Sequence, residues 1–368
     1  MKIHRVEASY LTNIPITPPP LLKEPSRATV IIVEVETDNG IVGYGATMGT
    51  LPWLTVEFIN RQAAPFLKDQ DPMLTERIWN QMFQNFNPRA PNAVWSWAMS
   101  AIDIALWDVK GKALGQSVWR LLGGAQNPVP AYITFGLPDY SLEQLVEAAK
   151  YWVGQGQDKL KMVVGVVGNS QDPDEDATRV RAVRETVGPG VQLMMDANCR
   201  MSFHHALRLC KLCEPYNITW FEEPVYQNDA RLLANLRRQT TIPIATGQSE
   251  VNRFRFLEFL VHEAVDILQP NVINVGGYTE ALKVAAMAQA FNKPIANGGA
   301  WPFQNMHLQA GMSNGWRVEF HYIRWMTCKS VYKETPDPVK GWVTVPETLG
   351  LGLDPKLGII NEYRASNQ

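Results

Sequence analysis

Three oxygen-bearing side chains recur at a regular interval near the middle of the chain. Asp196 ends the apolar run 193–195, Glu222 ends the apolar run 218–221, and Gln248 follows a third apolar stretch. Glu222 lies 26 residues after Asp196, and Gln248 lies 26 residues after Glu222, which suits one strand and helix unit. Carboxylate and amide oxygens are the ligands that Mg²⁺ takes in proteins. The spacing therefore predicts a divalent-cation site where successive parallel strands end.

Two lysines precede these groups in a further apolar run. Lys159 and Lys161 are separated by one residue, so in a strand both side chains project from the same face. The positive charges of the two lysines and the negative charges of the two carboxylates would compensate each other beside the amide, as charged groups of an active site do. A single carboxylate after a buried strand is more often a helix cap or a loop charge, but here the polar groups share one period.

The elements that must position these groups alternate from residue 129 onward. Uninterrupted apolar runs are typical of parallel strands that are covered on both faces, and helical patterns lie between them. Strand ends are predicted at Phe135, 161–164, Asp196, Glu222, Thr246, Gln269, Asn297 and Glu319, with helices such as 142–152, 174–186, 230–238 and 280–291. Eight such units predict a (β/α)8-type barrel with the polar groups at its carboxyl-end rim.

Residues 1–128 follow a different pattern. The runs 30–35 and 41–45 flank Asn39-Gly40, a pair that favours the tight turn of a β-hairpin, and helices are predicted at 55–67, 73–84 and 93–114. Glycine and proline between 121 and 128 mark the end of this part. We therefore divide the chain into an α+β domain at 1–128, the barrel at 129–332 and a tail at 333–368.

The segment SAIDIALWDVKGKALGQSVWRLLGG at 100–124, together with the paired lysines and the acidic strand ends, resembles the enolase superfamily. The similarity is to the mandelate racemase subgroup of the mandelate racemase/muconate lactonizing enzyme family and covers nearly the whole chain. It implies a capping domain built from the N-terminal segment and the C-terminal tail. It also implies Mg²⁺ as cofactor, a small carboxylate substrate such as a sugar acid, and a homo-oligomer.

The resemblance assigns roles to the residues that match the family's motifs. Asp196 and Glu222 match two of three metal ligands, Lys161 matches the lysine that acts as base, and Lys159 matches the lysine that precedes it. Since each ammonium group disfavours the charge of the other, we expect a lowered pKa for Lys161 and substrate carboxylate binding by Lys159. Abstraction of a proton next to a carboxylate needs such a base together with a divalent cation.

Other residues are expected to contact the substrate. Asn198 and Glu223 lie beside the expected ligands, and Glu319 matches a carboxylate of the last strand that contacts the substrate in the family. Trp301, with Trp53 of the capping segment, is a candidate pocket wall, although ordinary packing explains a tryptophan at least as well. Asn297 stands where a histidine ends the seventh strand in much of the subgroup.

The departures from the family pattern shape the predicted chemistry. Gln248 stands where the family carries a glutamate, and Glu250 is an alternative third ligand two residues later. Asn271 and Asn297 replace the Asp and His of a catalytic dyad, and no lysine follows the sixth strand. Of the six histidines, only His321 lies where it could reach the site.

A single base on one face favours a lyase, a sugar-acid dehydratase that works through an enolate. A racemase, epimerase or lactone cycloisomerase is the enzymatic alternative, and a ligand-binding barrel without turnover is the other.

Composition limits the partners and the compartment. The 368 residues carry a formal net charge of -2 without a long run of one sign, which gives no electrostatic footprint for nucleic acid or an anionic membrane. No long apolar segment indicates a signal peptide or a membrane span, so we expect a cytoplasmic protein. The four cysteines are too few and too unevenly spaced for a disulfide framework, and we expect reduced thiols.

Overall fold

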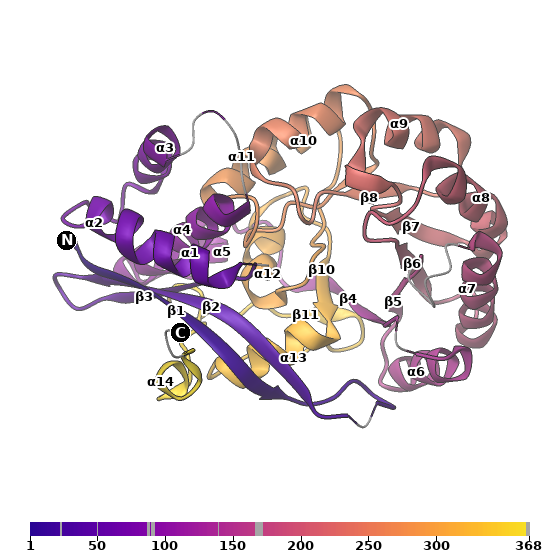
Figure 1. Ribbon diagram of the computed structural model, residues 1–368, viewed down its shortest axis with the longest axis horizontal. Helices are drawn as coiled ribbons and strands as arrows, with labels where there is room; N and C mark the ends of the chain where they lie inside the picture. Colours follow the sequence, from indigo (N-terminus) through magenta and orange to yellow (C-terminus); the bar gives the residue numbers. More distant parts are fainter. Residues whose placement is uncertain are drawn as a thin grey trace.

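An antiparallel sheet opens the chain and forms one end of the molecule (Figure 1). The computed structural model describes residues 1–22, 24–49, 51–86, 89, 93–138, 140–165 and 172–365. Strands β1 (Ile3–Ile16), β2 (Ser26–Thr37) and β3 (Val42–Thr47) pair in that order. In the β2–β3 hairpin Val33 pairs with Gly45, which confirms the predicted hairpin around Asn39-Gly40.

Helices cover one face of this sheet. They are α1 (Pro52–Phe58), the π-helical turn η1 (Ile59–Ala63), α2 (Ala64–Leu67), α3 (Thr75–Phe86) and α4 (Ala93–Leu114), close to the predicted ranges. Helix α4 packs directly on β3, where a Cβ atom on Gly43 or Gly45 would lie 2.3 Å or 1.9 Å from a carbonyl oxygen of α4. Only glycine at these two positions lets helix and strand approach so closely.

A parallel sheet forms the second part of the fold. Its order is β10-β4-β5-β6-β7-β8-β9, with bounds β4 (Val129–Gly136), β5 (Lys159–Val163), β6 (Gln192–Asp196), β7 (Ile218–Glu222), β8 (Ile244–Thr246), β9 (Ile267–Leu268) and β10 (Val318–His321). Residues 295–297 link its two edges, because Ala296 N–H donates to Leu268 O at 2.9 Å and Asn297 N–H donates to Arg317 O at 2.7 Å. The predicted seventh strand is therefore a short bridging segment.

Helices surround this ring in the order expected for a barrel (Figure 1). They are α5 (Val118–Leu121), α6 (Leu142–Gly154), α7 (Pro173–Val187), α8 (Phe203–Cys213), α9 (Ala230–Gln239), α10 (Asn252–Val261), α11 (Gly277–Ala290), α12 (Pro302–Gly311) and α13 (Tyr322–Val331), with 3-10 turns η3 (Glu214–Tyr216) and η4 (Tyr226–Asn228). The apolar outer faces of the strands and the inner faces of these helices form one continuous core.

The last segment returns to the capping sheet. Strand β11 (Trp342–Val343) pairs antiparallel with the first residues of β4, and α14 (Ile359–Tyr363) lies on β1, where Leu11 bridges Arg364. Both chain ends lie on the capping side in Figure 1. Helix α13 contacts β1 as well as β10, so the barrel and cap share packing, and the division at 128 and 332 stays a prediction.

Strand alternation decides which side chains enter the barrel. A small apolar cluster inside it comprises Tyr132, Met194, Trp220, Ala245, Ile267 and Ala296. In register, Val163 pairs with Asp196 and Asp196 pairs with Glu222, so these three residues share one level near the ends of β5, β6 and β7.

Within the described residues, no helix is both long and apolar enough to cross a membrane.

Candidate active site

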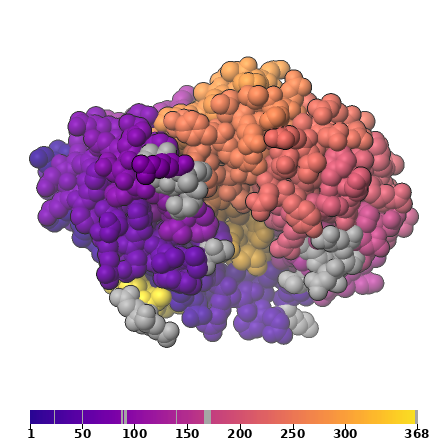
Figure 2. All heavy atoms as spheres, turned by 45° about the horizontal axis from the view of Figure 1, so that its top comes forward, coloured from indigo at the N-terminus to yellow at the C-terminus, as the bar shows by residue number. Residues whose placement is uncertain are grey.

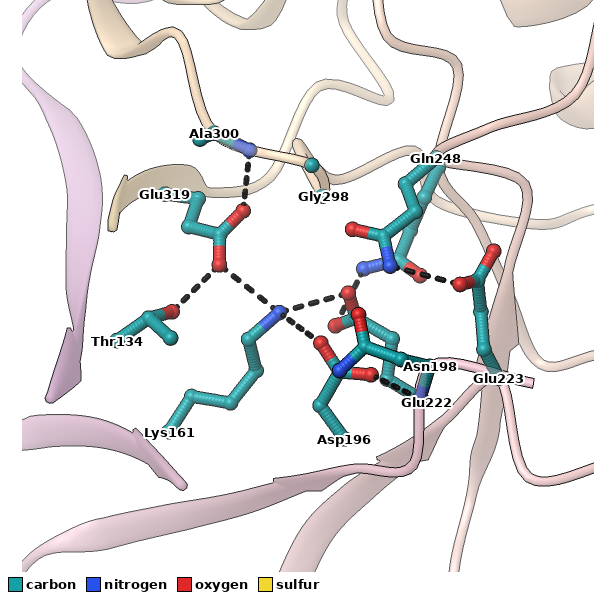
Figure 3. Close-up of polar contacts among 12 residues, drawn as sticks. Thr134, Lys161, Asp196, Asn198, Glu222, Glu223, Gln248, Gly298, Ala300 and Glu319 are labelled. Carbon is teal, nitrogen blue, oxygen red and sulfur yellow. Dashed lines mark hydrogen bonds and ion pairs between the residues drawn. The ribbon is translucent and has the colours of Figure 1, made fainter. Parts of the chain in front are cut away.

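One ammonium group sits at the centre of the barrel rim among three carboxylates (Figure 3). Lys161 Nζ lies 2.7 Å from Glu222 Oε1, 2.9 Å from Glu319 Oε1 and 3.1 Å from Asp196 Oδ2. Strands β5, β6, β7 and β10 supply these four side chains, all from positions that alternation turns inward. The structure thus brings together four of the residues that the sequence singles out.

The electrostatics of this cluster follow from its burial. Lys161 and Glu222 are fully buried. Burial alone would lower the pKa of Lys161, but Glu222, Glu319 and Asp196 raise it well above its ordinary value. Burial would raise the pKa of Glu319, yet Lys161 holds it below its ordinary value. Lys161 is therefore charged as the cluster stands.

Lys159 does not join this cluster, so the expectation that both lysines face one site is wrong. It is the first residue of β5, and its Nζ lies 2.7 Å from Asp158 Oδ1 and 3.3 Å from Gly341 O. Trp342 of β11 covers it, and β11 pairs with the first residues of β4. Lys159 thus lies at the opposite end of the barrel, where it can neither bind the substrate carboxylate nor lower the pKa of Lys161.

The surroundings of Glu222 contain residues that sequence reasoning missed. Glu222 Oε2 accepts hydrogen bonds from Trp220 Nε1 at 3.0 Å and from Gln269 Nε2 at 2.8 Å. A Cβ atom on Gly298 would lie 2.7 Å from Gln269 Nε2 and 3.0 Å from Glu222 Oε1, so glycine is required there. Trp220 could have been found because it precedes Glu222 by two residues and shares its strand face.

Glu319 is fixed from two sides. Thr134 Oγ1 donates to Glu319 Oε1, and the backbone N–H of Ala300 donates to Glu319 Oε2 at 2.6 Å. Asn297 supports the same turn, since its Nδ2 donates to Gly298 O and Ala300 O and its Oδ1 accepts from Glu319 N–H. The carboxamide of Asn297 is thus occupied by backbone groups, and its expected role in substrate binding stays a prediction.

Gln248 and Glu223 form a second, adjoining group. Gln248 Nε2 donates to Glu223 Oε2 at 2.7 Å, so its carbonyl oxygen turns toward the Lys161 cluster in Figure 3. Asn228 Nδ2 donates to Glu223 Oε1 at 3.1 Å. Burial and the nearby Asp196 raise the pKa of Glu223 to about 7. Glu250, the alternative ligand, is instead held by Asn228 and Arg255.

The remaining predicted contacts differ in exposure. Asn198, held in a left-handed conformation with φ of 48°, is exposed beside Asp196, and its backbone N–H donates to Asp196 Oδ1 at 2.8 Å.

Trp301 is fully buried, and its Nε1 donates to the sulfur of Met48 from the capping segment at 3.2 Å. Trp301 therefore packs the cap against the barrel, and its expected role as a substrate wall stays a prediction. Trp53, 56% exposed, remains available.

The charge of the site fits a divalent cation. One ammonium group faces three carboxyl groups in this buried cluster, so acidic groups are in excess, and burial raises the pKa of Glu222 well above its ordinary value. Such an excess is costly unless a cation compensates it. Among the described residues, no three His, Cys, Asp or Glu side chains are already arranged around a common ion position. Asp196, Glu222 and the carbonyl oxygen of Gln248 are the donors that a Mg²⁺ ion would use.

In the strands that the structure describes, no lysine lies at the level of Asp196 and Glu222. Val163 occupies that inward-facing level of β5, and Lys161 lies one inward-facing position lower. Asn271 is also occupied, because its Nδ2 donates to the carbonyl oxygens of Gly298 and Gly299. Figure 2 shows the last barrel segment, in gold, at the base of a recess between the indigo capping residues and the barrel.

Comparisons with known proteins agree with this architecture. Residues 144–358 match the family model described as enolase C-terminal domain-like, and residues 19–123 match the mandelate racemase/muconate lactonizing enzyme N-terminal domain. The chain is 31% identical over 350 residues to arabinonate dehydratase of Saccharolobus solfataricus, covering 92% of this chain and 91% of that protein.

Solved structures also resemble the whole chain. The 3,6-anhydro-D-galactonate cycloisomerase of Zobellia galactanivorans superposes with a TM-score of 0.87 at 31% identity, covering 100% of both chains. L-talarate dehydratase of Polaromonas sp. JS666, solved with Mg and L-glucarate, gives a TM-score of 0.88 at 28% identity, covering 99% of this chain and 98% of that one.

Proposed function

Because the chain belongs to the mandelate racemase/muconate lactonizing enzyme family of the enolase superfamily, we propose that it is a Mg²⁺-dependent lyase that dehydrates a sugar acid. The reaction begins with removal of the proton next to the substrate carboxylate and passes through an enolate. The β-hydroxyl group then leaves as water, and the product becomes a 2-keto acid.

The observation that carries this proposal is the convergence of Lys161 with Asp196, Glu222 and Glu319 at the rim. An α-proton next to a carboxylate is too weak an acid to be removed unless the developing negative charge is stabilised in advance. A bound Mg²⁺ would act as a Lewis acid that withdraws charge from the substrate carboxylate. Asp196, Glu222 and Gln248 Oε1 would hold it.

Lys161 contributes a fixed positive charge to the same carboxylate. The ammonium is buried, is oriented by its three partners and needs no reorganisation when the substrate carboxylate gains charge. Its raised pKa argues against the role of base that the family resemblance assigned to it. Asn198, which is exposed at the rim beside Asp196, would contact hydroxyl groups of the sugar acid.

A cycloisomerase is the second candidate, and a specific observation favours it. The anhydro-galactonate cycloisomerase matches this chain over its full length at 31% identity, as high as the dehydratase match. Both reactions start with or return a proton next to a carboxylate and need the same rim charges. They differ in whether the departing oxygen leaves as water or stays within the molecule.

A panel of acid sugars tests the proposal. Arabinonate, L-talarate, L-glucarate and 3,6-anhydro-D-galactonate would each be incubated with the protein in D₂O, with MgCl₂ or with EDTA. We expect a 2-keto acid that has lost water from at least one open-chain acid, only with MgCl₂. Ring opening or closure without mass change would favour the cycloisomerase. Binding of the acids without product or α-deuterium exchange would favour a ligand-binding barrel and refute the lyase.

A further inference from the structure

Residue His321 is the one histidine carried by a strand of the barrel sheet in the described part of the chain. It ends β10, two residues after Glu319, so alternation places both side chains on the inward face. Each residue of a strand advances about 3.3 Å, which places His321 roughly 7 Å closer to the rim than Glu319. The imidazole therefore stands above the carboxylate that contacts Lys161.

The immediate surroundings leave this imidazole free to act. Its Nδ1 is buried and has no hydrogen-bond partner among the described residues, while the side chain as a whole is half-buried. Because Nδ1 is buried, Nε2 is the nitrogen that we expect a ligand to contact. The charged groups that face the ring are Glu319 on its own strand, Lys161 on β5, Asp196 on β6 and Arg324 on α13. Burial lowers the pKa of His321, which keeps the ring neutral and able to accept a proton.

We infer that His321 is the general base that removes the α-proton of the acid sugar, an inference that rests on the proposed lyase function. The site needs such a group, because Lys161 is held by three carboxylates, Val163 is apolar, and Asn271 and Asn297 are bound to backbone. No residue matched to the family's catalytic positions remains for this step.

In the proposed dehydration, one proton passes through His321 and one electron pair passes through the substrate carboxylate. Nε2 of His321 takes the proton from the carbon next to the carboxylate, and the electron pair of the broken C–H bond enters the carboxylate as an enolate. When this pair returns, the C–O bond to the β-hydroxyl group breaks. The imidazolium gives its proton to the leaving oxygen, which departs as water, and the remaining enol converts to the 2-keto acid. Nε2 is then neutral again.

The test compares His321→Gln with the matched control His262→Gln, whose histidine is exposed at the end of α10. For an acid that the wild type dehydrates, we expect His321→Gln to lower α-deuterium exchange and keto-acid formation by about 10²-fold or more. Mg²⁺ affinity and thermal stability should stay close to those of the wild type, and His262→Gln should retain full activity. The acid limb of the kcat/KM profile should disappear in His321→Gln.

A second measurement separates this inference from the proposed function. The imidazole NMR signal of His321, identified by its loss in His321→Gln, should shift when arabinonate and MgCl₂ are added, whereas the signal of His262 should not. If the wild type turns over an acid and His321→Gln turns it over at a rate within threefold of the wild type, the role of His321 as base is overturned. The proposed lyase function would then still stand. If no acid is turned over, the proposed function fails, and an unshifted His321 signal overturns the inference as well.

Discussion

Lys159 and Lys161 leave β5 on the same face, two residues apart, yet they serve opposite ends of the barrel. Lys161 Nζ contacts the three carboxylates at the rim. Lys159 Nζ binds Asp158 and the carbonyl of Gly341 beneath Trp342 of the returning tail. Alternation therefore determines which face of the strand a side chain leaves from. It does not determine how far along the barrel axis that side chain lies. Depth decides which lysine reaches the carboxylate cluster.

The largest effect is expected when Lys161 is replaced by methionine, and the same substitution at Lys159 is the matched control. Methionine keeps the length of the side chain and removes its charge. Lys161→Met should lower keto-acid formation by roughly 10³-fold, since it removes a preorganised charge from the reacting carboxylate. Lys159→Met should stay within about threefold of the wild type, because its charge faces the other end of the barrel. Steady-state rates with one acid sugar measure both. Equal losses of keto-acid formation in the two variants would show that the two lysines do not differ in function.

Stability should also distinguish the two lysines. Removing Lys161 leaves three buried carboxylates without their partner and should cost about 3–5 kcal/mol of unfolding free energy near pH 7, measured in urea without Mg²⁺. Lys159→Met should cost about 1 kcal/mol, the net value of its hydrogen bonds.

The pH dependence of the Lys161 contribution has a definite sign. The folded-state pKa of Lys161 is raised above 10.5, so its contribution is complete below that pH and is lost as the pH rises further. The pKa of Glu319 is lowered below 4.5, so that part is lost as the pH falls below this value. The stability difference between wild type and Lys161→Met should therefore be greatest between these limits. A difference that grows below pH 4 would contradict the ion cluster.

A smaller effect is expected at Thr134, which donates a hydrogen bond to Glu319. Thr134→Val keeps the shape of the side chain but leaves Glu319 oriented only by Lys161 and the N–H of Ala300. We expect kcat/KM to fall by roughly 10-fold to 100-fold, as for the loss of one hydrogen bond to a charged group, which is worth about 1.5–3 kcal/mol. Thr327→Val is the control, because that hydroxyl donates to Ile323 O within α13. Similar rates for the two variants would show that Thr134 does not position Glu319.

The smallest expected effect concerns the third metal ligand. Gln248 offers a carbonyl oxygen without charge, so Gln248→Glu should tighten Mg²⁺ binding by about tenfold. Glu250→Gln should change it little, because Glu250 is held by Asn228 and Arg255. Calorimetric titration of both variants measures the difference. The reverse order would transfer the ligand role to Glu250.

Much of this fold could be predicted because it depends on local patterns. Acidic residues at the ends of apolar runs mark Asp196 and Glu222, and Asn39-Gly40 marks the hairpin. Contacts between distant segments could not be predicted in the same way. The burial of Trp301 depends on Met48 of the cap, and the position of Lys159 depends on Gly341 of the tail. No local pattern reports either contact.

The seventh strand and its end illustrate the same limit. An apolar run before Asn297 predicts a strand, but residues 295–297 only bridge β9 and β10. Asn297 then turns its carboxamide to the backbone of Gly298 and Ala300. Similarly, the sequence predicts a strand end at Gln269, whereas the hydrogen bond from Gln269 to Glu222 depends on how the barrel strands come together.

Calorimetric titration of the wild type and of Glu222→Gln with Mg²⁺ tests whether Asp196 and Glu222, two of the carboxylates around Lys161, hold a divalent cation. We expect one Mg²⁺ site in the wild type, with tighter binding when arabinonate or another acid sugar of the panel is present. Glu222→Gln should lose that site, because it removes one of only two charged ligands. Equal Mg²⁺ affinity in the two proteins would show that Glu222 does not bind the cation.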